Sequence, residues 1–145
     1  MTYSSLGRFE QAVQIERDVY SGRLRLQGEQ NEVTILAANN YASTLKLLER
    51  FEEARSLLRR TIPVARHVLG DGHDVTLSLR TNYGIAIYLD TGATLDYLRE
   101  AVTTLEDTAR AARRVLGGAN PLVAKIERAL RESRAALHAR ETPHA

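Results

Sequence analysis

Apolar residues recur at helical spacing along nearly the whole chain, and no segment alternates between apolar and polar residues over the length of a strand. The pattern predicts an all-α protein of about six helices. We expect them at residues 8–26, 32–49, 51–69, 74–89, 95–116 and 121–140.

Residues that end one helix and begin the next recur at the predicted helix boundaries. A glycine follows three of the apolar runs, where it can adopt the positive φ that closes a helix: Gly28, Gly70 and Gly117. Three residues later stands a polar residue that can begin the next helix: Asn31, His73 and Asn120. Pro121 then suits the first helical position, because it has a fixed φ and needs no partner for an amide hydrogen.

Pro63 lies inside the third predicted helix, where it removes one backbone hydrogen bond and costs about 3 kcal/mol if unrelieved. We therefore expect a kink at this position. A bend that wraps the helix around its neighbours and a functional hinge are both compatible with the sequence.

The chain repeats with a period of 42 residues. Matching pairs are Phe9 and Phe51, Ala12 and Ala54, Gly28 and Gly70, and Asn40 and Asn82. A third copy is displaced, because Ala101 lies 47 residues after Ala54. Five residues, 90–94, are thus inserted between the fourth and fifth helices, where Thr94 can cap the fifth. This period alone fits several helical repeats and propeller blades, but blades need strands, which the pattern does not show.

The residues inside the repeat are more specific than its length. Small residues recur where paired helices must approach closely, at Ala42 or Gly84 in one helix and Ala54 or Ala101 in the next. The first copy contains Asn40-Tyr41-Ala42, Phe51-Glu52-Glu53-Ala54, Leu69-Gly70 and His73-Asp74. The second contains Asn82-Tyr83-Gly84, Arg99-Glu100-Ala101, Leu116-Gly117 and Asn120-Pro121. This series resembles the tetratricopeptide repeat in its lengthened, kinesin-light-chain-like form.

The resemblance implies a right-handed α-solenoid of antiparallel helix pairs in one domain, 1–145. A truncated first repeat would cover 1–28, followed by repeats at 32–70 and 74–117, a capping helix at 121–140 and a frayed tail at 141–145. In this register Met1 to Leu6 align with the end of a preceding first helix. The helix at 8–26 would then lack most of its partner and expose an apolar face, which a second copy or an adjacent domain would cover.

The resemblance also implies a site. First helices of such repeats line a groove that holds an extended peptide, and the signature asparagine, here Asn40 and Asn82, bonds the peptide backbone. An amide side chain has the donors and acceptor for this task, although both asparagines could equally tie adjacent repeats together. The same register places six neighbours in the groove: Asn39, Ser43, Lys46, Thr81, Ile85 and Tyr88. The third copy has Ala129 at the asparagine position, so the groove should be short.

We therefore expect a non-enzymatic scaffold that binds a protein or peptide segment. The alternative is an assembly module whose N-terminal edge packs on another copy of the chain or on a missing neighbouring domain. The composition argues against some classes of function and does not indicate a further one. The chain has no cysteine, and its 20 basic and 18 acidic residues leave a net charge of only +2, with the arginines scattered. Neither thiolate chemistry nor nucleic-acid binding is expected.

The sequence also lacks the motifs of metal-binding and nucleotide-binding sites. The four histidines show no metal-binding spacing, and no glycine-rich phosphate loop is present, so no metal, cofactor or catalytic residue is expected. No apolar run approaches the roughly 18 residues that span a membrane. The first residues lack the apolar core of a secretion signal, so we expect a cytoplasmic protein without membrane contacts.

Overall fold

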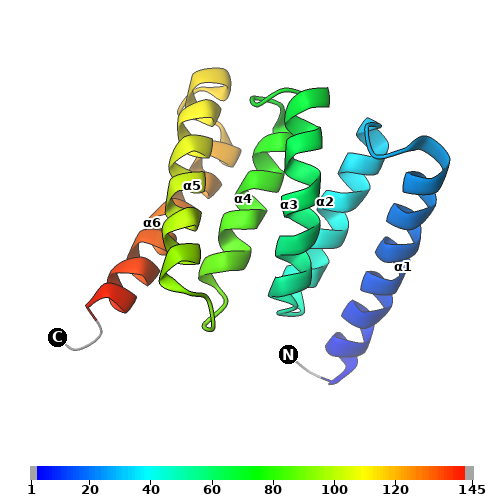
Figure 1. Ribbon diagram of the computed structural model, residues 1–145, viewed down its shortest axis with the longest axis horizontal. Helices are drawn as coiled ribbons and strands as arrows, with labels where there is room; N and C mark the ends of the chain where they lie inside the picture. The colour runs from blue at the N-terminus through cyan, green and yellow to red at the C-terminus, as the bar shows by residue number, and fades with distance from the viewer. Residues whose placement is uncertain (1–2, 143–145) are drawn as a thin grey trace. The chain divides into compact units, whose positions relative to one another are not determined.

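The computed structural model describes residues 3–142 and contains six α-helices over that range (Figure 1). They are α1 (Tyr3–Gln27), α2 (Glu32–Leu47), α3 (Phe51–Val68), α4 (Asp74–Tyr88), α5 (Leu95–Leu116) and α6 (Pro121–Glu141). No strand occurs among these residues, and none of the helices is long and apolar enough to cross a membrane. The predicted all-α class and the six helices are confirmed.

The chain divides into two compact units, and the division falls within α4. The N-terminal unit is Met1–Leu79 and the C-terminal unit is Arg80–Ala145. The sequence repeat suggested one continuous array and gave no sign of this division.

The predicted helix ends are formed by the expected residues. All three glycines have positive φ, with values of 80° at Gly28, 92° at Gly70 and 78° at Gly117. The Asn31 Oδ1 atom accepts a hydrogen bond from the Val33 amide, and Asn120 Oδ1 accepts one from Leu122, both at 2.8 Å. His73 acts in the same way, because its Nδ1 accepts from the Val75 amide at 3.1 Å.

Three boundaries differ from the sequence prediction. Helix α1 begins at Tyr3, so Tyr3 to Leu6 continue α1 and do not belong to a preceding helix; Met1 and Thr2 lie outside the described residues. Helix α2 ends before Glu49, which takes a left-handed φ of 60°. Helix α6 continues to Glu141, and Thr142 closes it by donating its hydroxyl to the His138 carbonyl, so 141–142 are ordered. Residues 143–145 of the predicted frayed tail lie outside the described residues.

In the N-terminal unit, α2 lies between α1 and α3 and packs against both (Figure 1). The core is made by Val13 of α1, Ile35 and Leu45 of α2 and Leu58 of α3, each at most 2% exposed. Burying an aliphatic side chain of this size contributes roughly 1.5–3 kcal/mol. The small residues predicted at the helix contacts, including Ala42 and Ala54, are fully buried.

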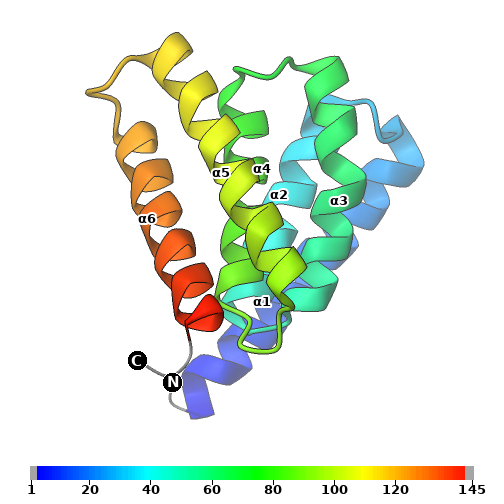
Figure 2. The ribbon, with the colours of Figure 1, turned by 60° about the vertical axis from the view of Figure 1, so that its left-hand side comes forward.

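In the C-terminal unit, α5 and α6 lie side by side and the end of α4 lies behind α5 (Figure 2). Gly84 of α4 meets Leu105 of α5 so closely that a Cβ atom on Gly84 would lie 2.7 Å from the leucine Cγ and Cδ1 atoms. The Tyr83 hydroxyl also donates to Glu100 of α5 at 2.7 Å. The close helix contact predicted at Gly84 is confirmed.

The inserted segment 90–94 forms an ordered turn within the C-terminal unit. The Asp90 carboxylate accepts from the Gly92 amide at 2.9 Å, and Thr94 caps α5 by accepting from the Tyr97 amide at 3.1 Å. Arg140, at the end of α6, donates to the Ala93 carbonyl at 2.7 Å. The insertion therefore fastens the last turn of α6 instead of forming a free loop.

Helix α3 continues as an α-helix through Pro63. Pro63 and Arg59 are both exposed, so the hydrogen bond that proline removes lies on the solvent side of the helix. A carbonyl on that side can bond to water, which lowers the cost of the proline. The bend expected at Pro63 stays a prediction.

Candidate protein-binding surface

The exposed side of α2 carries a line of mostly apolar side chains. Its members, called here the α2 stripe, are Val33, Leu36, Asn40, Ser43 and Leu47. They are three and four residues apart in alternation, so they fall on one side of the helix. The three apolar members are 43–54% exposed, and Asn40 is exposed at the centre of the line. Asn39 and Lys46 lie beside the stripe and are half-buried.

The opposite side of α2 holds this surface in place. Ile35, Ala38, Ala42 and Leu45 are at most 1% exposed and face the core of the N-terminal unit. The α2 stripe is therefore presented by a helix that is anchored along three turns, so the backbone that carries it is in place before any partner binds.

A shallow hollow lies at the C-terminal end of the α2 stripe. It is lined by Leu6 of α1, Leu47 of α2 and Leu48 and Glu49 of the following turn, and it has a volume of about 210 Å³. An apolar cavity of about 150 Å³ can hold a benzene molecule, so this one has room for a single large apolar side chain. We call it the Leu6 hollow.

Sequence reasoning missed this hollow because it assigned Leu6 to a different helix. In the structure, continuation of α1 back to Tyr3 brings Leu6 beside the end of α2, where it is 44% exposed. The 3-4-3-4 spacing of the α2 stripe was readable in the sequence, and its apolar members extend the predicted site beyond the family signature.

The predicted site residues of α4 divide by burial. Thr81 is 0% exposed and Asn82 is 4% exposed, so neither side chain reaches the surface to contact a ligand. Burial favours the structural alternative for Asn82, in contrast to the exposed Asn40. Ile85 and Tyr88 are half-buried, and Ala129, in the third copy, is buried.

Tyr88 is bound to its own unit. Its hydroxyl donates a hydrogen bond to the Glu132 carboxylate of α6. Burial and this bond together raise the pKa of Tyr88 well above its ordinary value, because both favour the neutral phenol. The phenol thus contributes to the stability of the C-terminal unit and remains protonated at neutral pH.

A second hollow, of about 280 Å³, lies on the other side of the N-terminal unit. Its lining residues are Tyr20, Tyr41, Leu45, Glu53, Ser56, Leu57 and Arg60. Its polar groups already bind one another or nearby residues: Tyr41 accepts from Arg17 at 3.1 Å, and Arg60 pairs with Glu29 at 3.8 Å. These internal contacts make it a weaker candidate for ligand binding than the α2 stripe.

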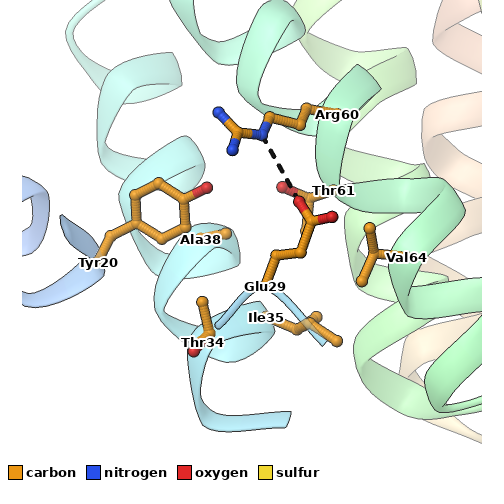
Figure 3. Close-up of a pocket in the computed structure, with 8 residues that line it drawn as sticks. All are labelled: Tyr20, Glu29, Thr34, Ile35, Ala38, Arg60, Thr61 and Val64. Atoms are coloured by element: carbon orange, nitrogen blue, oxygen red, sulfur yellow. Dashed lines mark ion pairs between the residues drawn. The ribbon is translucent and has the colours of Figure 1, made fainter. Parts of the chain in front are cut away.

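The small cavity between α1, α2 and α3 is part of the core. Figure 3 shows Glu29 reaching towards Arg60 across it, with Tyr20 and Val64 on either side. Its volume is about 10 Å³, which is close to the minimum for one water molecule. The buried Thr34 hydroxyl has no hydrogen-bond partner there, so a single water is the only occupant that size and polarity suit.

Metal chemistry finds no support in the described part of the chain. Between residues 3 and 142, no three histidine, cysteine, aspartate or glutamate side chains gather closely enough to hold an ion. His73 uses its Nδ1 atom to cap α4, while its Nε2 atom lies 3.6 Å from a Glu32 carboxylate oxygen.

Comparison with known proteins agrees with this geometry. Among curated proteins, none matches the chain. One family model matches residues 33–96, a span that includes the α2 stripe, all of α3 and α4, and the inserted turn. That family is the tetratricopeptide repeat, to which this segment of the chain is similar.

Proposed function

We propose that the chain is a protein-binding module that holds an extended protein segment along the α2 stripe. Tetratricopeptide repeats mediate protein–protein interaction, and the matched segment includes α2. One observation carries the proposal: Val33, Leu36 and Leu47 are exposed in one line with Asn40 between them. Aligned apolar exposure of this kind marks interaction surfaces, whereas scattered exposed residues do not.

The stripe suits a segment whose backbone is not already hydrogen-bonded. The Asn40 amide offers two donors and an acceptor, which can pair with one peptide group of an extended chain. Leu36 and Leu47 lie on either side of Asn40, so apolar side chains of the same segment can pack there. The Leu6 hollow would take the largest of them. Within the C-terminal unit, Ile85 and Tyr88 remain the predicted residues that have some exposed surface for a partner.

A selection experiment tests this proposal. Peptides selected from a random displayed library by the wild-type chain should contain a large apolar residue, and their affinity is then measured by fluorescence anisotropy. Asn40→Ala should weaken binding about tenfold, the effect of leaving one peptide group unpaired. Leu47→Glu should remove binding, because it places a carboxylate in the Leu6 hollow.

The matched control is Val115→Glu on α5. Val115 is 56% exposed, as accessible as Leu47, but belongs to the other unit. This variant should bind the selected peptides as wild type does, and all three variants should keep wild-type helicity by circular dichroism. If the peptides bind Asn40→Ala and Leu47→Glu with unchanged affinity, the α2 stripe is not the binding surface.

A further inference from the structure

The outer side of α1 carries a second line of apolar and small residues, on the side of the helix opposite its buried face. Its members, called here the α1 seam, are Ala12, Ile15, Val19, Gly22 and Leu26. Their spacing of 3, 4, 3 and 4 is the heptad pattern of helices that pack along a shared seam. Ile15 is 62% exposed, Val19 48% and Leu26 76%.

Helix α1 is therefore apolar on two sides. Its inner side packs on α2 through Val13, which is 2% exposed, and through the half-buried Phe9, Tyr20 and Leu24. A surface helix normally keeps one apolar side and one polar side. A second apolar side over three turns indicates a helix with a further partner.

The internal repeat shows what kind of partner fits. Ile15 and Val19 correspond, 42 residues later, to Leu57 and Thr61 of α3. Thr61 is 6% exposed and faces Ile35 of α2 across the small core cavity. At Thr61 the side of α3 equivalent to the α1 seam is thus covered by α2, which packs beside it, and a helix is the partner that fits the α1 seam.

Charge identifies that helix as a second copy of α1. The acidic residue Asp18 flanks the first half of the seam, and the basic residues Arg23 and Arg25 flank the second half; all three are exposed. Charges at these flanking heptad positions set the partner and the orientation of paired helices. In an antiparallel pair, the exposed Asp18 faces the exposed Arg25 of the partner subunit, and this contact occurs twice.

The same register matches the apolar members of the seam. Ile15 faces Leu26 of the partner subunit, and Val19 faces Gly22 of the partner subunit. Packing within one copy of the chain does not require glycine at position 22, because a Cβ atom there would meet nothing within 4 Å. A glycine in the middle of a helix lowers its stability, but it lets a neighbouring helix approach closely where a larger side chain faces it.

We propose that the α1 seam docks antiparallel on the α1 seam of a second copy, forming a two-fold symmetric dimer. Such an interface is isologous, so each contact occurs twice. Two heptads bury less than the about 1,600 Å² of a standard interface, so the dimer is weak and concentration-dependent.

Sedimentation equilibrium tests the proposal with the full chain. The average mass should rise from 16.2 kDa in dilute solution towards twice that value as concentration increases. Val19→Glu should raise the dissociation constant about thirtyfold or more, the size expected for a central interface position. Val115→Glu, which places the same charge on α5, should leave the dissociation constant unchanged. A wild-type chain that stays monomeric at about 1 mM, where even weak complexes form, overturns the proposal.

Charge reversal tests the orientation. The variants Asp18→Arg and Arg25→Glu should each lose self-association, because like charges then face each other between positions 18 and 25 of the two subunits. Their mixture should form a heterodimer with at least wild-type affinity. Two monomeric variants that fail to associate when mixed contradict the antiparallel pairing.

Cross-linking gives a direct measurement, because the chain has no cysteine of its own. Under oxidation, Ile15→Cys/Leu26→Cys should form a disulfide-linked dimer, whereas Leu26→Cys alone should not; cross-linking of the single variant instead indicates a parallel pair. The test is separate from that of the proposed function, since Val19→Glu should keep peptide binding and Leu47→Glu should keep self-association.

Discussion

A methyl group added at Gly84 should destabilise the C-terminal unit although alanine is the better helix former. The new Cβ atom would lie 2.7 Å from Cγ and Cδ1 of Leu105 and 3.0 Å from its Cδ2. Leu105 is fully buried, so it has no free space to move into. Overpacking of this kind costs about 1–3 kcal/mol, and the gain in helix propensity returns about 1 kcal/mol. We expect Gly84→Ala to lower the free energy of unfolding by about 1 kcal/mol.

The sign of this effect should reverse when Leu105 is shortened. Leu105→Ala alone should cost about 2–5 kcal/mol through lost burial and the cavity it leaves. In that background the methyl group on Gly84→Ala meets no leucine and fills part of the cavity, so the substitution should raise the free energy of unfolding by about 1 kcal/mol. The two substitutions are therefore coupled by about 2 kcal/mol, within the range seen for residues in direct contact.

Urea denaturation followed by circular dichroism measures all four chains of this cycle. Gly22→Ala in α1 is the matched control, because its Cβ atom would meet nothing within 4 Å. In dilute solution it should stabilise by up to about 1 kcal/mol with either residue at position 105. If Gly84→Ala has the same sign in both backgrounds, the contact with Leu105 does not explain the glycine.

Three further outcomes follow from individual contacts. Asn120→Ala should cost about 1 kcal/mol in a thermal or urea unfolding experiment, because α6 loses its N-cap. Arg140→Ala should cost about 1 kcal/mol by removing the bond from α6 to the 90–94 turn, with Arg131→Ala, an exposed arginine of the same helix, as a neutral control. Tyr88 has a raised pKa in the folded state, so its stabilising effect is complete below about pH 10 and declines at higher pH. Unfolding measured at about pH 9 and pH 11 should show a smaller decline in Tyr88→Phe; an equal decline would show that Tyr88 does not titrate as inferred.

The helix pattern was predictable because its signals are local. A glycine with positive φ and an asparagine three residues later each act on the backbone beside them, and the structure uses Gly28 with Asn31 and Gly117 with Asn120 as the sequence indicated. The boundary at Glu49 was not predictable in this way. Its left-handed φ is unusual for glutamate and is accompanied by a hydrogen bond from the Arg50 amide to the Leu45 carbonyl at 2.9 Å.

The candidate site was only partly predictable because exposure depends on packing. Asn40 and Asn82 hold equivalent places in the repeat, and nothing local to either residue distinguishes them. One is exposed and the other is 4% exposed, so a role transferred by position suits the first and not the second. The Leu6 hollow depends on where α1 begins, which the family register placed incorrectly. Side chains more than 40 residues apart in sequence form it, and no local signal connects them.

The two proposed surfaces of the N-terminal unit share a spacing but differ in chemistry, and the difference identifies their partners. An extended segment has unpaired peptide groups, so a surface that binds it needs polar groups among its apolar contacts. The α2 stripe has them, at Asn40 and Ser43. The backbone groups of a helix are already hydrogen-bonded to one another, so a surface that binds a helix needs apolar side chains in the line and charged side chains beside it. The α1 seam has that composition, with no hydrogen-bonding side chain in the line and opposite charges at its two ends. Each surface should therefore lose its own interaction when it is given the chemistry of the other. Val19→Asn should weaken self-association, and Asn40→Leu should weaken peptide binding although the line of apolar residues stays intact.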